Sequence, residues 1–221
     1  MTIPSATRAS PFSAEDVRLR ALARLRLDLA PDALLAPVSA GDHVLSPDAF
    51  PPDVSKPGRP AAVLVPIVAR AEGATVLLTK RAARLRQHSG QIAFPGGKID
   101  PQDESPIAAA LREAWEEIGL HASHVDPLGS LDIYATGTGF RIFPLVAIVR
   151  PPFELTLNTD EVDDVFEVPV RFLMDPANHQ LHTREAEGVA RHFHAMPYEG
   201  RFIWGATAGM LKNLHARLYC D

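Results

Sequence analysis

From residue 61 onward, apolar residues alternate with polar ones or cluster between turn residues. Residues 61–70 are apolar and β-branched, a Glu72-Gly73 turn follows, and residues 75–79 are apolar again. Two such runs around a glycine turn predict a β-hairpin. Further short strands are expected near residues 128–134, 140–149, 165–168, 180–184, 190–195 and 201–204, with a helical turn at 169–174.

Helical spacing of apolar residues marks a segment near each end of the chain. Ser13 is a good N-cap, and apolar residues recur at helical spacing from there until Pro31. Residues 205–218 carry a similar stripe. Residues 31–60 are rich in Pro, Asp and Gly, which predicts a long connection.

These elements predict the class of fold and the organisation of the chain. Strands and helices mix without regular βαβ alternation, which favours an α+β fold, or a layered α/β/α arrangement. Residues 1–60 are expected to form a tail, a helix and a linker that pack on the core, and residues 61–221 the main domain.

Composition narrows the class of protein and its partners. The 221 residues are 46% hydrophobic and 22% charged, as in soluble globular proteins. A net charge of -5 argues against general nucleic-acid binding. The single cysteine, Cys220, fits a reducing compartment. The longest apolar stretch, 61–69, is far shorter than the roughly 20 residues of a membrane span, and no signal peptide is expected, so we predict a cytoplasmic protein without a membrane partner.

Residues 105–118 read as a helix with a clear beginning and end. Ser105 is a good N-cap, Pro106 suits the first helical position, and Gly119 is a natural stop. The apolar stripe that we expect to seat this helix on the core contains Ala108, Leu111, Trp115 and Ile118.

Three glutamates share another face of the same helix. Glu113, Glu116 and Glu117 are three and four residues apart, so their carboxylates repel one another. A divalent cation such as Mg²⁺ or Mn²⁺ would turn that repulsion into a binding site. Arg112 lies four residues before Glu116 and is expected to hold it by an ion pair. The alternative interpretation is a solvated acidic helix face.

A glycine-rich turn immediately upstream favours the metal site over the solvated face. Gly96 and Gly97 allow close approach of the backbone to a ligand, and a carbonyl such as that of Gly97 can bind a metal. Asp103 and Glu104 follow before the helix begins, and either is a candidate outer carboxylate.

Together these residues resemble the Nudix box, G-x5-E-x7-R-E-U-x-E-E-x-G-U, in which U is a bulky apolar residue. Six residues, not five, separate Gly97 from Glu104, so the choice between Asp103 and Glu104 stays open. The resemblance implies a Nudix-type α/β/α sandwich with a mixed sheet and a metal-dependent hydrolase of phosphoanhydride bonds. The matching residues are Arg112, Glu113, Glu116, Glu117, Gly119 and Leu120, with the small Ala114 at the first U.

A second motif precedes the box and is similar to that of the coenzyme A diphosphatase branch of this family. It consists of Leu77-Leu78-Thr79-Lys80-Arg81-Ala82, Arg86, Gly90 and Phe94-Pro95-Gly96-Gly97. The resemblance implies hydrolysis of coenzyme A (CoA), or its thioesters, to 3′,5′-ADP and 4′-phosphopantetheine or its acyl form. The small-molecule substrate would be the partner, and a homodimer is left open.

Basic residues within this motif are candidates for binding the phosphates. Arg81 and Arg86 are the first choices, since arginine binds phosphate in bidentate fashion, and Lys80 and Arg84 lie beside them. His88 is a further candidate. The alternative interpretation for each is a structural ion pair or hydrogen bond.

The resemblance implies metal ligation by Glu113, Glu116 and Glu117, with the Gly97 carbonyl and an outer role for Asp103 or Glu104. The general base stays open between Glu117 and Glu161, which lies in the loop from Asn158 to Glu161. Glu116 and Arg112 complete the catalytic set that we expect.

Other functions are compatible with parts of this pattern. One alternative is a Nudix enzyme specific for ADP-ribose, a dinucleoside polyphosphate or a damaged nucleotide. Another is an inactive Nudix domain that binds CoA or a nucleotide without turnover. A zinc site is a further, weaker alternative for His179, His182, His192 and His194.

Overall fold

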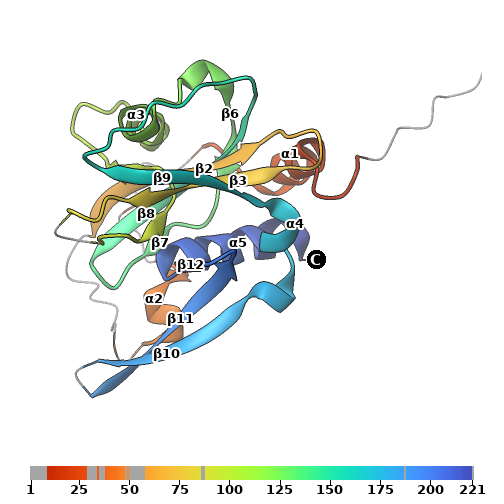
Figure 1. Cartoon of the computed structure of the whole chain (residues 1–221). Helices are drawn as coiled ribbons and strands as arrows, with labels where there is room; N and C mark the ends of the chain where they lie inside the picture. Colours follow the sequence, from red (N-terminus) through yellow and green to blue (C-terminus); the bar gives the residue numbers. More distant parts are fainter. Residues whose placement is uncertain are drawn as a thin grey trace, which may run out of the picture.

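A mixed β-sheet forms the centre of the protein (Figure 1). The computed structural model describes residues 9–28, 34, 38–47, 49, 58–85, 88–186 and 188–220. Strand β2 (Arg59–Val68) runs parallel to β8 (Phe140–Val149) and antiparallel to β3 (Thr75–Arg81). The sheet also contains β1 (Ala40–Gly41), β4 (Ile92–Ala93), β5 (Gly96–Lys98), β6 (Val125–Ser130), β7 (Tyr134–Ala135) and β9 (Val162–Pro169).

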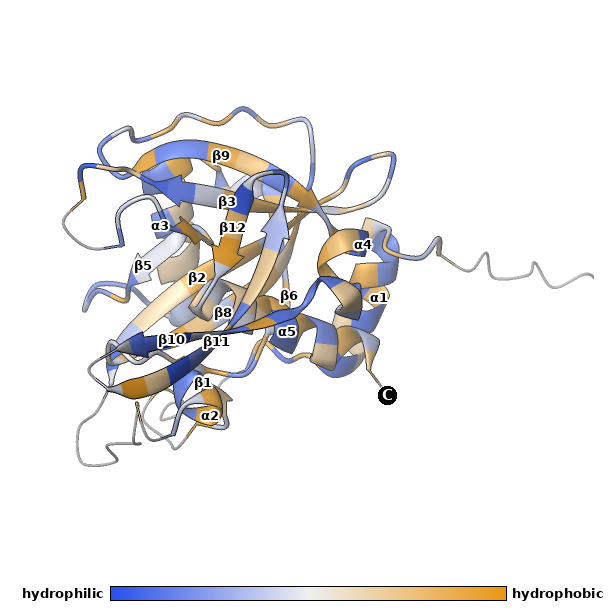
Figure 2. Cartoon of the chain, turned by 60° about the horizontal axis from the view of Figure 1, so that its bottom comes forward, coloured by the Kyte–Doolittle hydropathy of each residue, from blue (hydrophilic) through white to orange (hydrophobic). Residues whose placement is uncertain are grey.

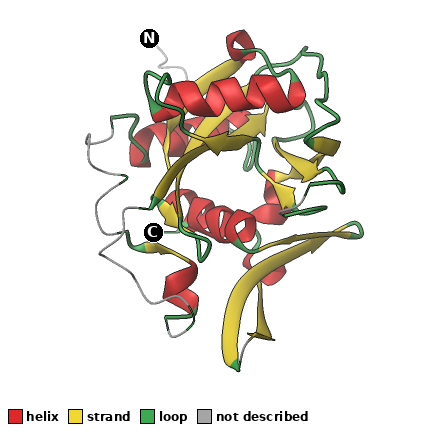
Figure 3. Cartoon of the chain, turned by 90° about the vertical axis from the view of Figure 1, so that its left-hand side faces the viewer, coloured by secondary structure: helices red, strands yellow, loops and turns green. Residues whose placement is uncertain are grey.

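Helices cover both faces of this sheet, which confirms the predicted α/β/α layers (Figure 3). Helix α3 (Pro106–Ile118) packs on one face, and α1 (Ala14–Arg24) and α5 (Ala206–Tyr219) pack on the other. Side chains of β2 alternate between the two apolar clusters, as expected for a strand buried on both sides. Figure 2 shows the mainly hydrophobic colour of β2 and β8.

A second, antiparallel sheet lies beside α5 (Figure 1). It contains β10 (Gln180–Ala186), β11 (Val189–Tyr198) and β12 (Arg201–Trp204), which confirms the three strands predicted there. Buried Met196 and Ile203 join this sheet to the cluster under α1 and α5. The remaining elements are α2 (Asp42–Leu45), α4 (Val170–Leu173) and the 3-10 helices η1 (Ala122–His124) and η2 (Pro176–Asn178).

The N-terminal helix begins where the sequence predicts and ends earlier. The Ser13 side chain accepts a hydrogen bond from the Asp16 amide, as an N-cap does. The helix ends at Arg24 because Leu25 is extended, so the prediction that it continues to Pro31 is wrong. Residues 1–8, within the predicted tail at 1–12, and residues 31–33, 35–37, 48 and 50–57 of the predicted linker lie outside the described residues. Among the described residues, no helix is long and apolar enough to cross a membrane.

The predicted apolar stripe of α3 is wrong in one important respect. Trp115 is 54% exposed and packs edge-on against His121, instead of seating the helix on the core. The buried apolar positions belong to small residues, Ala109, Ala110 and Ala114, together with Ile118. Small side chains let the helix approach the sheet closely, which a buried tryptophan would prevent.

Gly209 illustrates a similar close contact on the other face of the sheet. A Cβ atom there would lie 2.4 Å from the Tyr134 hydroxyl and 2.7 Å from Cε2 of the same ring. Gly→Ala in a helix normally stabilises by about 1 kcal/mol, but overpacking costs about 1–3 kcal/mol. We expect Gly209→Ala to lower the free energy of unfolding, measured in urea. In a Tyr134→Phe background, which lacks that hydroxyl, Gly209→Ala should lower the free energy of unfolding by less. A G209A protein as stable as its parent would contradict this packing.

Candidate active site

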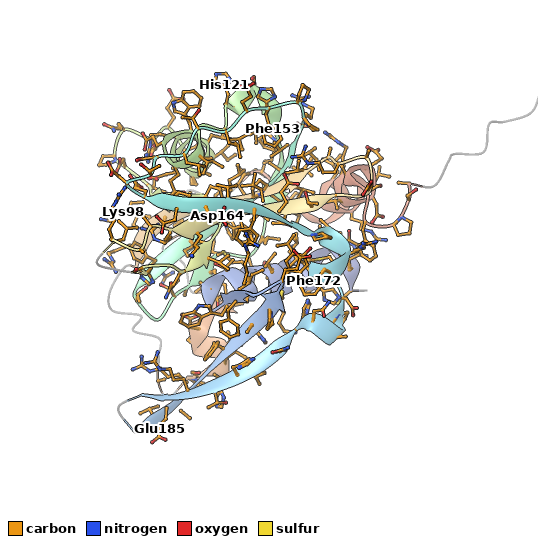
Figure 4. All side chains as sticks on the ribbon, viewed as in Figure 1. Lys98, His121, Phe153, Asp164, Phe172 and Glu185 are labelled. Atoms are coloured by element: carbon orange, nitrogen blue, oxygen red, sulfur yellow. The ribbon has the colours of Figure 1, made fainter. Side chains whose placement is uncertain are left out.

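Two glycines of β5 bring backbone directly against the glutamates of α3. A Cβ atom at Gly97 would lie 2.5 Å from the Glu113 carboxyl carbon and 2.6 Å from each of its oxygens. Gly96 has a φ of +153° and donates its N–H to Glu117 Oε2 at 3.1 Å. Lys98, labelled in Figure 4, ends this strand beside the helix. The glycine turn and two of the glutamates therefore lie in direct contact.

Glu117 is the most buried carboxyl group of the site, with 3% of its surface exposed. Burial raises its pKa to about 7, and the charges of Glu113 and Glu161 add to that rise. The Gly96 N–H and the Arg81 guanidinium act in the opposite direction. Burial also raises the pKa of Glu113, against the effect of Arg112. Two desolvated carboxyl groups that repel each other suit a bound cation.

Arg112 holds several acidic side chains in fixed positions. It donates from Nε and Nη2 to the two oxygens of Asp103, each at 2.9 Å. From Nη1 it donates to Glu116 at 2.9 Å, which is the predicted ion pair, and to Glu113 at 3.1 Å. Its Nη2 also donates to the Lys98 carbonyl at 3.1 Å. The hydrogen bonds raise the Arg112 pKa, so the guanidinium remains charged.

The two candidates for the outer carboxylate have different surroundings. Both oxygens of Asp103 face Arg112, and one of them also accepts the Asp100 N–H at 2.7 Å. The Arg112 hydrogen bond lowers the Asp103 pKa. Glu104 is exposed, and its side chain has no hydrogen bond or ion pair to a residue that the structure describes. Asp103 is therefore built into the site through Arg112.

The predicted phosphate-binding residues do not all come together. Arg81 lies in the site: its Nη1 is 3.7 Å from Glu117 Oε1, and its side chain is 28% exposed. Its buried Nε has no hydrogen-bond partner among the described residues. Lys80 is exposed on the opposite face of β3, because successive strand residues alternate. Arg86 lies outside the described residues.

His88 and Arg84 have structural partners. The His88 ring contacts Gln91 Oε1 at 2.8 Å, and its residue has a φ of +57°. Arg84 donates to the Thr159 carbonyl and pairs with Asp160 at 2.6 Å. Sequence reasoning grouped Arg84 with the phosphate-binding cations, and only the fold shows that it faces the loop that carries Glu161.

The donor set of the site fits a divalent cation. Among the residues that the structure describes, no three His, Cys, Asp or Glu side chains already surround one point, either here or among the four histidines. In the acidic site, the arginines hold the carboxylates: Arg112 binds Glu113 and Glu116, and Arg81 faces Glu117. Crowded, partly desolvated carboxylates are nevertheless the oxygen ligands that Mg²⁺ and Mn²⁺ prefer.

Three of the four histidines of the zinc alternative contact other partners. His179 Nε2 lies 2.7 Å from the Leu173 carbonyl, His182 Nε2 lies 2.9 Å from Gln180 Oε1, and His192 Nδ1 lies 2.8 Å from Thr183 Oγ1. Among the described residues, therefore, these histidines do not favour a zinc site.

Comparison with known proteins identifies the family. The model of the NUDIX domain matches residues 58–193. An uncharacterized Nudix hydrolase named NudL from Yersinia pestis is 41% identical over 160 residues, which are 72% of this chain and 80% of that protein. The chain belongs to the Nudix family. It is a hydrolase that acts on phosphoanhydride bonds, and Nudix hydrolases generally use divalent ions such as Mg²⁺ or Mn²⁺.

Solved Nudix structures resemble parts of the chain. The Nudix hydrolase RenU from M. smegmatis is 26% identical with a TM-score of 0.43, and the match covers 51% of this chain and 71% of RenU. A C. elegans Ap4A hydrolase in a binary complex is 23% identical with a TM-score of 0.43, over 51% of this chain and 81% of that one.

Paired substitutions at Asp103 and Glu104 test which carboxylate serves the Nudix site. Asp103→Asn weakens two hydrogen bonds to a charged partner, each typically about 1.5–3 kcal/mol. We expect its kcat to fall on the order of 10–100-fold, while Glu104→Gln stays within about 2-fold. Steady-state kinetics with a saturating substrate measure both. The reverse order of losses would assign the outer role to Glu104.

Proposed function

We propose that this Nudix hydrolase cleaves the diphosphate of CoA or acyl-CoA, giving 3′,5′-ADP and 4′-phosphopantetheine or its acyl form. The observation that carries the proposal is the position of Arg81. It belongs to the motif that resembles the CoA diphosphatase branch, and its Nη1 is 3.7 Å from the buried Glu117 carboxylate. That motif continues to Gly96 and Gly97, which contact the Nudix glutamates. Both motifs thus line a single site.

In this proposal the glutamates hold Mg²⁺ or Mn²⁺. Glu113, Glu116 and Glu117 are the ligands, with the Gly97 carbonyl beside them. When bound, such ions neutralise the diphosphate and lower the pKa of water. Arg112 offsets the repulsion between Glu113 and Glu116 and orients both side chains, since one guanidinium nitrogen donates to both.

Arg81 has the charge and the setting to bind the diphosphate. Its side chain is partly exposed and carries a positive charge, so the guanidinium can donate to a phosphate oxygen. Binding there would also screen the substrate from the negative charge of Glu117. Arg86 remains a candidate for the 3′-phosphate from its place in the motif.

Glu161 is the general base that we propose. Its charge raises the pKa of both Glu113 and Glu117, so its carboxylate lies within electrostatic reach of them. Water attacks one phosphorus atom and loses a proton to Glu161. The anhydride P–O bond breaks, and its electron pair stays on the leaving phosphate. Glu117 is the second candidate, but Gly96 and Arg81 already face its oxygens.

Product analysis tests the substrate. The enzyme should convert CoA and acetyl-CoA, with Mg²⁺ or Mn²⁺ present, to 3′,5′-ADP and the matching phosphopantetheine, detected by mass spectrometry. ADP-ribose and a dinucleoside polyphosphate serve as competing substrates. Efficient cleavage of ADP-ribose with none of CoA would overturn the assignment. Tight CoA binding with no turnover of any substrate would instead indicate an inactive sensor.

Replacement of Glu117 tests the catalytic centre. Glu117→Gln keeps the shape of the side chain and removes its charge, so we expect kcat to fall by about 100-fold or more. Glu154→Gln, at an exposed position, is the matched control and should keep the parental rate. If E117Q retained more than about a tenth of the rate, Glu117 would have no essential role.

A further inference from the structure

The loop before β9 is joined to the end of the glutamate helix. The Thr156 N–H donates to the Ile118 carbonyl and the Asn158 N–H to the Glu117 carbonyl, each at 2.9 Å. The last carbonyl groups of a helix lack partners within the helix. This loop supplies two of those partners, so its position is fixed relative to Glu117.

Asn158 also determines the conformation of the loop itself. Its carbonyl accepts the N–H groups of Glu161 and Val162, both at 2.9 Å. Its side-chain Oδ1 accepts the Asp160 N–H at 3.1 Å, which closes an Asx turn. From the other side, the Ala82 N–H donates to the Glu161 carbonyl at 2.8 Å. The backbone at Glu161 is therefore held by Ala82, which follows β3, and through Asn158 by the end of α3.

The amide group of the same asparagine reaches the Glu161 carboxylate. Nδ2 of Asn158 lies 3.3 Å from Glu161 Oε1 and donates to it. Glu161 Oε2 accepts no hydrogen bond from the residues that the structure describes. An asparagine side chain both accepts and donates, whereas aspartate only accepts. Asn158 is thus suited to closing the turn and holding one oxygen of Glu161 at the same time.

We infer that Asn158 is a positioning residue, which orients Glu161 toward Glu113 and Glu117 through its side-chain amide and through the backbone contact with Glu117. The inference rests on the proposed role of Glu161 as the general base. It assigns a function to Asn158, the first residue of the Asn158–Glu161 loop, which lies outside the Nudix box. Asn158 itself contacts neither the water nor the diphosphate.

A double-mutant cycle tests this inference. Asn158→Asp keeps the turn-closing oxygen but loses the donor and repels Glu161. We expect its kcat to fall on the order of 10–100-fold, as for a misplaced catalytic group, with KM changed by less than about 3-fold. In a Glu161→Gln background, the same substitution should change kcat by less than about 3-fold, because the group it orients is already gone.

Asn178→Ala is the matched control, since Asn178 also donates one side-chain amide hydrogen bond, to the Phe172 carbonyl at 2.9 Å. It should keep the parental kcat. If N158D lost the same factor with and without Glu161, or kept the full rate, Asn158 would not act through Glu161. Full activity of E161Q alone would overturn both the base and this inference, whereas the product assay tests the substrate separately.

Hydrogen exchange of the metal-free protein gives a readout that needs no substrate. Asn158→Ala should speed exchange of the Asp160 and Glu161 amides by about 10-fold or more, which corresponds to roughly 1.4 kcal/mol of lost local stability. Exchange within α3 should not change, and N178A should leave the loop as it is. Unchanged exchange at Asp160 and Glu161 in N158A would contradict the inference.

Discussion

Close contact between the backbone of β5 and two carboxyl groups of α3 determines the geometry of the active site. Any side chain at Gly97 would occupy the position of the Glu113 carboxyl group, and the Gly96 N–H contacts Glu117. The contact requires a helix that lies close to the sheet, which its buried alanines permit. The same closeness removes Glu117 from water and raises its pKa. The features that make the site chemically useful thus follow from backbone packing.

Burial of several acids in one place creates repulsion that the fold offsets from two sides. Arg112 binds Asp103, Glu113 and Glu116 on one side, and Arg81 faces Glu117 on the other. The carboxylates still outnumber the arginines, since Glu161 also acts on the site. The remaining negative charge favours the binding of divalent cations. Removal of either arginine would leave a buried carboxylate without its charged partner.

Local signals made some parts of the molecule predictable from sequence. Ser105, Pro106 and Gly119 define α3 because each acts within a few residues of itself, and helical spacing brings Glu113 and Glu117 together in any context. The hairpin of β2 and β3 follows from similar local signals.

Other features depend on contacts that are distant in sequence. The exposure of Trp115 follows from how α3 lies on the sheet, which apolar periodicity alone does not specify. The pairing of Asp103 with Arg112 depends on the path of an irregular turn. Lys80 could have been separated from Arg81 by strand alternation, because adjacent residues face opposite sides. The role that we infer for Asn158 could not be predicted from the sequence, because its N–H donates to the Glu117 carbonyl, which is distant along the chain.

The joint between Asn158 and the end of α3 also has a consequence for how the enzyme forms. Helix α3 carries its own start and stop signals, whereas β6, β7 and β8 lie between it and Glu161 in the sequence. Contacts of this kind close a long loop and are completed after local structure. We therefore expect catalytic competence to arise late in folding. Weakening these hydrogen bonds should accelerate unfolding more than it slows folding. Contacts at the active site would then help to determine how long the native enzyme persists before it unfolds.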